Sequence, residues 1–328
     1  QADQELTIDF FRAGMATFAD PGDRVLILLP GETPGSVGDL LEIALERMGA
    51  QPIKHGLVRD VGETLQVMGQ ERVDGVIGVP YQVHALAAYG PEIKLKHALL
   101  TTDHVPNAIV KAVENAWGCA VYNHYGMTEM GLGGGVDCDA HRGYHLREAD
   151  LLFEIVDPAT GLVVPEGTYG EVVFTTLTRT GMPLIRYRTG DASRFVPDVC
   201  GCGTRLRTLE RVRGRVGGAV EAGGAEIWLP ELDEALFAIP GLLTFAAAVT
   251  NEGRDCLTLE VQAMEGRGSE VAAAVDAALA GLRAVEAACT SGRLDVAVTV
   301  LQTRYVPSGK PKRTIVDRRD SSEDANGA

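Results

Sequence analysis

The sequence predicts an α/β protein in which a parallel sheet is followed by a small antiparallel β region and then by a small α+β domain. Three observations support this prediction. Short apolar strands alternate with amphipathic helices over residues 1–150. Closely spaced strands separated by turn residues follow in 151–213. Strands and alanine-rich helical sequence then occupy 214–319, about the size of one further domain.

The first region consists of strand–helix–strand units, which build a parallel sheet with helices on its faces. The apolar run 23–30 predicts a buried strand, 40–48 has helical spacing, and 51–54 is the next strand. The further elements predicted here are strands at 75–79, 97–101 and 120–122, and a helix at 107–117.

A glycine-rich turn lies between the first predicted strand and helix. Gly31, Gly35 and Gly38 could let a nucleotide phosphate approach the backbone. Their spacing, G-x-x-x-G-x-x-G, differs from the G-x-G-x-x-G dinucleotide fingerprint. We therefore interpret the turn as a connecting or pocket-lining loop.

Two further regions follow the parallel sheet. Short strands at 151–156, 170–176 and 184–187 predict a small antiparallel sheet or barrel. The elements predicted after residue 214 are a helix near 230–237, strands near 245–250 and 257–262, a long helix at 270–288 and a strand at 294–301. The predicted domains are thus 1–213 and 214–319, with a flexible tail at 320–328.

The composition excludes several classes of protein. Hydrophobic residues make up 45% of the chain and charged residues 23%, which excludes a disordered tail protein or a collagen-like fibre. The net charge of −15 repels phosphate backbones, so we expect no nucleic-acid partner. No run of about 18 apolar residues occurs, so we expect no membrane span. Six cysteines are too few for a disulfide framework, and the expected location is the cytoplasm.

Four polar clusters together supply what ATP chemistry requires. They are Tyr125-Gly126-Met127-Thr128-Glu129, Tyr187-Arg188-Thr189-Gly190-Asp191, Gly214-Arg215 and Ser308-Gly309-Lys310. An exposed aromatic ring at Tyr125 can stack on adenine, and the Asp191 carboxylate can accept hydrogen bonds from both ribose hydroxyls. Thr128 offers a hydroxyl to a phosphate, and Glu129 offers an oxygen ligand to Mg²⁺. Lys310 can stabilise a developing oxyanion. Singly, each cluster could be an ordinary turn or a solvated basic tail; the order of all four favours a functional interpretation.

This order of motifs resembles the adenylate-forming superfamily of acyl-CoA synthetases and ligases, and within it the phenylacetate–CoA ligase branch. The stretch that supports the resemblance best runs from Glu154 through Gly170-Glu171 to Asp191, with Cys202-Gly203 after it. The resemblance implies a large AMP-binding domain followed by a small, mobile C-terminal lid domain. It also implies two half-reactions, in which a carboxylate and ATP first give acyl-AMP and pyrophosphate, and CoA then displaces AMP. The substrates and cofactors implied are an aryl carboxylic acid, ATP, Mg²⁺ and CoA.

The resemblance also assigns roles to individual residues. It implies that Lys310, Thr128 and Glu129 act in catalysis, with Glu129 binding magnesium. The nucleotide-binding residues that it implies are Thr102, Asp103, Tyr125, Gly126, Met127, Thr128, Asp191 and Arg215. The residues implied for the acyl pocket are Tyr81, His124 and Gly126.

Two features depart from the family pattern. The glycine- and serine/threonine-rich phosphate loop is absent, so we expect that the chain begins just after it and lacks roughly the first hundred residues of a full ligase. We expect such a fragment to bind AMP weakly and to be inactive. The hinge motif is Gly214-Arg215-Val216-Gly217-Gly218, without the two carboxylates that are usual in the family.

Cysteines and histidines in two separate loops predict a structural zinc site. Cys138, His141 and His145 follow Glu129, and Cys200 and Cys202 follow Asp191. Some members of the phenylacetate–CoA ligase branch resemble this pattern, which implies Cys138, His145, Cys200 and Cys202 as the zinc ligands. The alternative is two unrelated turns with free thiols.

Several functions remain open at this stage. The leading one is an AMP-forming acyl-CoA ligase. The sequence does not specify the oligomeric state, although the resemblance implies that a homodimer would be common for such a protein. One alternative is an adenylating enzyme with an acceptor other than CoA. The other is a non-catalytic nucleotide-binding homologue, which the missing phosphate loop and Gly217-Gly218 favour. The sequence does not specify the carboxylic acid.

Overall fold

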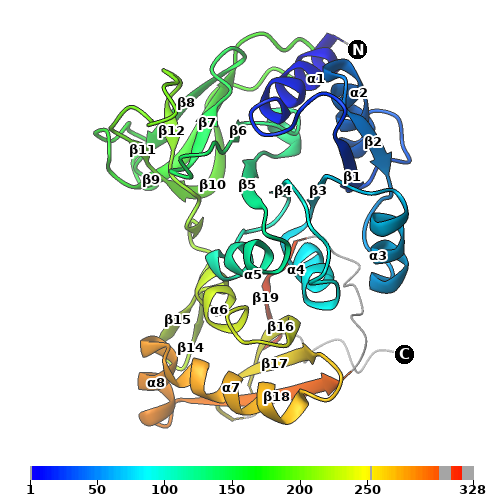
Figure 1. Cartoon of the computed structure of the whole chain (residues 1–328). Coiled ribbons are helices and arrows are strands. Elements are labelled where there is room, and N and C mark those ends of the chain that lie inside the picture. Colours follow the sequence, from blue (N-terminus) through cyan, green and yellow to red (C-terminus); the bar gives the residue numbers. More distant parts are fainter. Residues whose placement is uncertain (1, 252, 303–311, 320–328) are drawn as a thin grey trace, which may run out of the picture. The chain divides into compact units, whose positions relative to one another are not determined.

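Five parallel strands form one side of the main sheet in the computed structural model (Figure 1). The structure describes residues 2–251, 253–302 and 312–319. The strands are β1 (Arg24–Leu28), β2 (Gln51–Lys54), β3 (Gly75–Gly78), β4 (His97–Leu100) and β5 (Ala120–Tyr125), in the order β5-β4-β3-β1-β2. β3 and β4 are buried along their whole length, as strands covered on both faces must be. The predicted parallel sheet is therefore confirmed.

Helices accompany these strands. α1 (Ala2–Met15) precedes β1, and the connections between successive strands contain α2 (Val37–Met48), α3 (Val61–Gln70), α4 (Pro80–Tyr89) and α5 (Asn107–Trp117). α1 packs beside α2, and α3 packs beside α4 (Figure 1). In α5, Ile109, Val113 and Trp117 recur every fourth position and are fully buried, which explains why this segment is helical. The turn before α2 is closed by a hydrogen bond from Gly38 N to Pro30 O, in agreement with a connecting loop.

Short antiparallel strands extend the main sheet beyond β5. They are β6 (Gly135–Val136), β7 (Tyr144–Leu146), β12 (Thr208–Leu209) and β11 (Phe195–Val196), in the order β5-β6-β7-β12-β11. The sequence analysis assigned the whole of 151–213 to the small β region. The structure instead places β11 and β12 in the main sheet, because β12 pairs with β7. This pairing brings the loop after β6 close to the loop after β11.

The second sheet is small and antiparallel, as predicted. It contains β8 (Leu151–Val156), β9 (Gly170–Thr176), β10 (Tyr187–Ser193) and β13 (Gly214–Arg215), in the order β13-β10-β9-β8. Phe153 and Phe174 of this sheet share a buried cluster with Tyr125 and Leu146 of the main sheet. The third predicted strand, 184–187, begins only at Tyr187, because Arg186 has a φ of 49° and interrupts the extended backbone.

The remaining elements form an α+β arrangement. A four-stranded sheet has the order β18-β17-β16-β19, and β14 pairs with β15. The elements are β14 (Val220–Ala222), β15 (Ala225–Ile227), α6 (Leu229–Leu236), β16 (Leu242–Asn251), β17 (Asp255–Ala263), α7 (Gly268–Ala280), α8 (Arg283–Thr290), β18 (Leu294–Gln302) and β19 (Ile315–Asp317). The long helix expected at 270–288 is two helices, because Leu282 has extended backbone angles and separates α7 from α8.

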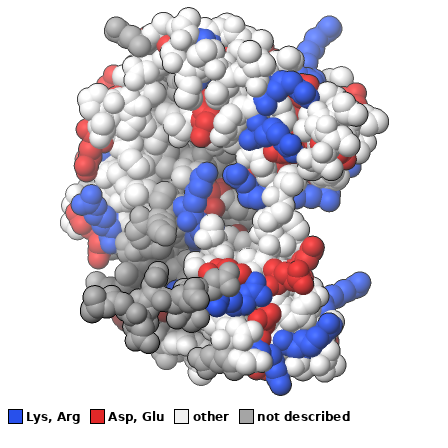
Figure 2. Space-filling model, turned by 180° about the vertical axis from the view of Figure 1, so that it is seen from behind, with Lys and Arg blue, Asp and Glu red and all other residues white. Residues whose placement is uncertain are grey.

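The described residues divide into two compact units. Gln1–Val105 and Val113–Val216 belong to one unit, and residues 106–112 and those from 217 onward belong to the other. Basic and acidic side chains are interspersed on the face shown in Figure 2. Among the described residues, no helix has both the length and the apolar character that are needed to cross a bilayer.

A buried ion pair lies within the second unit. The Arg313 guanidinium contacts both carboxylate oxygens of Asp233, at 2.8 and 2.9 Å. The Asp233 side chain is fully buried, and the Arg313 side chain is 9% exposed. The guanidinium also lies over the rings of Phe237 and Phe245, at 4.9 and 5.3 Å from their centroids. The pair therefore fastens the segment before β19 to α6.

Removing Arg313 should destabilise the protein strongly. Arg313→Ala leaves the Asp233 carboxylate buried without its partner, and we expect a loss of about 3–5 kcal/mol in the free energy of unfolding. Urea denaturation followed by circular dichroism measures this loss. Arg254→Ala is the control, because Arg254 and Asp295 form an ion pair at 3.0 Å whose side chains are 51% and 59% exposed. That variant should lose less than about 1 kcal/mol. Equal losses in the two variants would contradict the prediction.

Candidate functional site

The carboxyl ends of neighbouring parallel strands bring several predicted site residues to one edge of the main sheet. Tyr81 follows β3, Thr102 and Asp103 follow β4, and Tyr125 ends β5. The three strands are adjacent and in register, with Gly78 opposite Leu100 and Leu100 opposite Asn123. Open α/β sheets bind ligands at this edge. The arrangement therefore makes the edge the candidate nucleotide site.

Thr102 has an unusual backbone conformation. Its φ is 81°, a region that β-branched residues rarely adopt. The preceding residue, Thr101, donates its N–H to Gly78 O at 3.1 Å, so the chain turns sharply where β4 ends. Such strained residues cluster at ligand sites. The observation supports the interpretation of Thr102 and Asp103 as part of a binding edge.

The segment after β5 requires glycine at position 126. A Cβ atom on Gly126 would overlap Leu132 O, because the chain folds back on itself here. Leu132 N donates to Met127 O at 2.8 Å and closes the turn. Gly126 and Met127 are half-buried, so they form the wall of the turn.

A 3₁₀ turn at Thr128–Met130 presents the two polar side chains of this motif. Thr128 is exposed and Glu129 is half-buried. The Arg179 guanidinium donates to Met130 O, and it lies 3.4 Å from Glu129 O. A Cβ on Gly131 would overlap this guanidinium. Arg179 thus fixes the main chain of the turn that presents both polar side chains.

Tyr125 is buried, although the sequence analysis expected an exposed ring. Its relative exposure is 8%, and its ring stacks on Tyr144 with centroids 5.5 Å apart. Its hydroxyl donates to Asp191 Oδ2 at 2.9 Å. Burial and then the charge of Asp191 raise the pKa of Tyr125 well above its usual value, so the hydroxyl stays protonated and remains a donor. The expected exposure of the ring was wrong because a sequence motif does not show which side chains at the end of a strand are covered by other segments.

Asp191 of β10 connects the small antiparallel sheet to the end of β5 through its hydrogen bond with Tyr125. It is 7% exposed, and its Oδ1 lies 3.4 Å from Nη1 of Arg215, the residue opposite it in β13. Tyr125, Asp191 and Arg215 therefore form one polar cluster, assembled from three strands and two sheets. The Arg215 side chain is 61% exposed and can reach a ligand.

His124 and Tyr81 are more enclosed than surface pocket residues. The His124 ring lies 6.0 Å from both the Phe10 and Phe11 rings of α1, and its Nδ1 is 2.8 Å from the Thr101 hydroxyl oxygen. Burial lowers the pKa of His124 to about 4, so the ring is neutral at neutral pH. The Tyr81 side chain is fully buried in the first turn of α4. The predicted acyl-pocket roles of His124, Tyr81 and Gly126 stay predictions.

The proposed catalytic lysine, Lys310, lies outside the described residues. Lys312, two positions later, is described and exposed. Gly214 and Arg215 of the expected hinge motif form β13, which pairs with β10.

The structure brings together the four predicted metal ligands. Sγ of Cys138, Cys200 and Cys202 and a ring nitrogen of His145 all lie within 4.8 Å of one another. Cys138 Sγ is 3.6 Å from Cys200 Sγ, and His145 Nε2 is 3.2 Å from Cys138 Sγ and 3.3 Å from Cys202 Sγ. A tetrahedral zinc ion with Zn–S bonds of about 2.3 Å separates sulfur atoms by about 3.8 Å. The donor set and its spacing therefore fit zinc.

The surroundings of this cluster suit a metal. His145 Nδ1 is 3.3 Å from the Thr208 hydroxyl oxygen, which leaves Nε2 directed at the thiols. Burial lowers the pKa of His145, so its imidazole is in the neutral form that a metal binds. Burial raises the pKa of Cys138 to about 12, so this thiol ionises at neutral pH only with help from a cation. His141 instead contacts Asp137, at 3.2 Å.

Three residues at the site were missed by the sequence analysis. Tyr144 stacks on Tyr125, Arg179 holds the carbonyls of the Thr128–Met130 turn, and Glu171 binds the chain next to Asp191. None of the three shows a local pattern of its own, because each acts on a segment far away in the sequence.

Comparisons with known proteins agree with this geometry. The sequence profile of the family described as AMP-binding enzyme matches residues 9–178. A phenylacetate–coenzyme A ligase of Thermus thermophilus is 35% identical over 179 residues, which are 53% of this chain and 40% of that protein. The Escherichia coli protein of the same name is 31% identical over 162 residues, which are 48% of this chain and 36% of that protein. The chain thus spans less than half the length of these relatives.

Solved structures share the fold. A crystal structure of 2-hydroxyisobutyryl-CoA ligase, in the postadenylation state with R3-HIB-AMP, has a TM-score of 0.78 and 24% identity. It covers 97% of this chain, which corresponds to 70% of that protein. The amide bond synthetase McbA of Marinactinospora thermotolerans has a TM-score of 0.62 and 17% identity, and covers 95% of this chain and 64% of that one. At these identities the likeness establishes the fold.

The lowered pKa of the half-buried His124 makes the stability of the fold depend on pH. Its folded-state pKa of about 4 lies below the ordinary value near 6.5, so the unfolded chain takes up the proton first. The stabilisation is complete above pH 6.5 and is lost as the pH falls from 6.5 towards 4. His124→Gln removes this proton uptake. We expect the free energy of unfolding, from urea titrations between pH 7 and 5, to fall less steeply in the variant than in the wild type. Identical slopes would contradict the prediction.

Proposed function

The chain belongs to the AMP-binding enzyme family, and from this premise we propose that it forms the nucleotide-binding part of an ATP-dependent, AMP-forming carboxylate–CoA ligase. The observation that supports this function best is the polar cluster of Tyr125, Asp191 and Arg215 beside the Thr128–Met130 turn. This cluster lies at the carboxyl edge of the parallel strands, where nucleotides bind in open α/β sheets.

In the proposed reaction a substrate carboxylate oxygen attacks the α-phosphorus of ATP, and the bond to the pyrophosphate leaving group breaks. The sulfur of CoA then attacks the acyl carbon of the acyl-AMP, AMP leaves, and the thiol proton is released. Both steps require a firmly held AMP group. Asp191 would accept hydrogen bonds from the ribose hydroxyls, and Arg215, already 3.4 Å from Asp191, would contact the same sugar.

The turn after β5 would contact the phosphates. Thr128 is exposed and can donate its hydroxyl to a phosphate oxygen. Glu129 lies beside Tyr187, whose pKa is raised by burial and then by the Glu129 carboxylate. A half-buried carboxylate on a turn is a suitable ligand for Mg²⁺. When bound, the magnesium ion would neutralise charge on the leaving pyrophosphate.

The proposed acid is aromatic, and the proposed acceptor is CoA. Two relatives that match this chain are named phenylacetate–coenzyme A ligase. Thr102, Asp103, Gly126 and Met127 would line the adenine side of the site, and Tyr81 and His124 the acyl side. The fold is shared with an amide bond synthetase, so an acceptor other than CoA is the alternative that the experiment below must separate.

We expect the function to depend on Lys310. In the proposed adenylation step this ammonium group stabilises the negative charge that builds on the reacting carboxylate and α-phosphate. For the full-length protein, ATP-dependent pyrophosphate release across a panel of carboxylic acids, with and without CoA, tests the function. Lys310→Ala should reduce acyl-adenylate formation by about 10²–10³-fold, the scale of losing one such donor.

Two comparisons decide the result. Lys312→Ala is the matched control and should reduce the rate far less, and thioester formation from supplied acyl-AMP should be largely retained in Lys310→Ala. No pyrophosphate release with any acid would contradict the proposed function. Release that yields no acyl-CoA when CoA is supplied would favour the other acceptor.

We also propose that Cys138, His145, Cys200 and Cys202 hold one structural zinc ion. The mutual spacing of the four ligand atoms supports this site. The ion would join the loop after β6 to the loop after β11, and both loops adjoin the strands that extend the main sheet. Its role would be to stabilise this part of the fold, because all four positions are filled by protein ligands.

Elemental analysis tests the zinc site. Purified protein should contain about one zinc per chain, and the Cys200→Ser, Cys202→Ser double variant should lose it. We expect that variant to melt about 5 °C or more below the wild type, because a metal that binds only the folded state stabilises it. Cys289→Ser, in the other unit, is the control and should retain the metal. Metal-free wild-type protein, or a double variant of unchanged melting temperature, would contradict the proposal.

A further inference from the structure

β10 contains an irregularity next to Asp191. In the pairing with β9, Arg188 lies opposite Val173 and Ala192 lies opposite Glu171. Three residues of β10 therefore face the single residue Val172 of β9. A bulge of this kind redirects a side chain and leaves backbone groups without ladder partners. The groups freed here belong to the segment that presents the Asp191 carboxylate.

Side chains take over the hydrogen bonds that the ladder loses. The Gly190 N–H donates to Glu171 Oε1 at 3.0 Å, and the Thr189 hydroxyl donates to Val172 O at 2.8 Å. The Asp191 N–H donates to the Thr189 hydroxyl oxygen at 3.0 Å. Gly190 has a φ of 76°, a conformation that requires support from its surroundings. Glu171 of β9 thus binds the backbone of the bulge directly.

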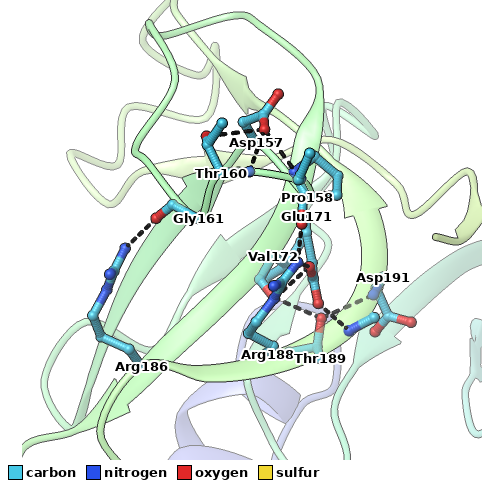
Figure 3. Close-up of polar contacts among 12 residues, drawn as sticks. Asp157, Pro158, Thr160, Gly161, Glu171, Val172, Arg186, Arg188, Thr189 and Asp191 are labelled. Carbon is cyan, nitrogen blue, oxygen red and sulfur yellow. Dashed lines mark hydrogen bonds and ion pairs between the residues drawn. The ribbon is translucent and has the colours of Figure 1, made fainter.

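Glu171 is itself held firmly. Its relative exposure is 4%, and its Oε2 accepts from Nε and Nη2 of Arg188, the former at 2.8 Å. Arg188 Nη2 also donates to Pro158 O at 2.7 Å, in a turn closed by the Asp157 carboxylate. Figure 3 shows Glu171 and Arg188 together over the sheet, with the Asp191 carboxylate pointing away from them. The contacts form a continuous series from the turn to Asp191.

We propose that Glu171 is a positioning residue for Asp191, because it holds the bulge that directs the Asp191 carboxylate toward the ribose of the nucleotide. This inference rests on the proposed function, in which Asp191 binds ribose. Glu171 does not touch the ligand. Its loss should therefore weaken recognition of the ribose hydroxyls and leave the contacts to adenine and phosphate in place.

The neighbouring Arg186 provides a matched control. Its guanidinium donates to Gly161 O at 3.0 Å (Figure 3). It also contacts Glu154 at 3.1 Å, so Arg186 resembles Arg188 in binding one carboxylate and one turn carbonyl. It has no contact with the bulge among the interactions of the described residues, and its side chain is 50% exposed. Arg186→Met therefore removes a similar set of bonds without touching Gly190.

The experiment compares the dissociation constants of AMP and 2′,3′-dideoxy-AMP, measured by calorimetry or ligand-observed NMR on the 328-residue chain. Two hydrogen bonds to a carboxylate should make AMP bind the wild type about 10- to 100-fold more tightly. In Glu171→Ala this ratio should fall to about 3 or less, while the affinity for dideoxy-AMP changes less than about threefold. Glu171→Gln keeps an oxygen for the Gly190 N–H and should recover most of the ratio. Arg186→Met should keep the wild-type ratio.

Each outcome has a definite meaning. If Glu171 had a purely structural role, Glu171→Ala would lower the affinities for AMP and dideoxy-AMP by the same factor, and this result would overturn the inference. A wild-type affinity ratio in folded Glu171→Ala would also overturn it. If Glu171→Ala does not fold, the Glu171→Leu, Arg188→Leu double variant takes its place. This variant replaces the ion pair by apolar groups, a change that proteins often tolerate. It must show the same lowered ratio of AMP to dideoxy-AMP affinity. A wild-type ratio near one would overturn both the ribose role of Asp191 and the inference. A high wild-type ratio retained without Glu171 would overturn the inference alone.

Discussion

The hydrogen bond between the Tyr125 hydroxyl and Asp191 Oδ2 connects the two sheets of the first unit. Tyr125 is the last residue of the central parallel strand β5, and Asp191 lies in the small antiparallel sheet. Both side chains are buried, so breaking the bond would cost the Tyr125 hydroxyl this acceptor and Asp191 Oδ2 this donor where water cannot easily replace them. The apolar cluster around them, with Phe153 and Phe174, keeps water out. The position of the Asp191 carboxylate at the carboxyl edge of the main sheet therefore depends on this hydrogen bond.

Much of the fold could be predicted from local sequence patterns. Buried strands such as Arg24–Leu28 and helices such as Asn107–Trp117 have their own periodicity, and each turns up where that periodicity predicts it. α1 was not predicted, although Ile8, Phe11 and Met15 recur at helical spacing and are buried. The long helix predicted at 270–288 ends instead at Ala280, with Gly281 as its C-cap and Leu282 extended after it. Gly281 is the sequence signal for this break, and it was missed because the residues on either side are strong helix formers.

The sequence predicted those site residues that belong to a recognisable motif. The sequence could propose Tyr125, Asp191 and four metal ligands, but not their surroundings. The burial of Tyr125 depends on its stacking against Tyr144, which lies in a different strand. Its hydrogen bond joins it to Asp191, which is 66 positions away in sequence. The same holds for Glu171 and Gly190, which meet only because β9 and β10 pair with a bulge. Register between strands is a property of the assembled core, and no single segment encodes it.

The contact between Gly131 and Arg179 has a consequence for how this sequence can change over time. The guanidinium occupies the space that any side chain at position 131 would need, and it holds the carbonyl of Met130. Gly131 also has a φ of 65°, so a side chain at this position would strain the backbone even if the guanidinium moved aside. A smaller residue at 179 would therefore not relieve position 131, and it would leave the Met130 carbonyl without its donor. Position 131 should accordingly stay glycine in homologous sequences, whichever residue occupies position 179.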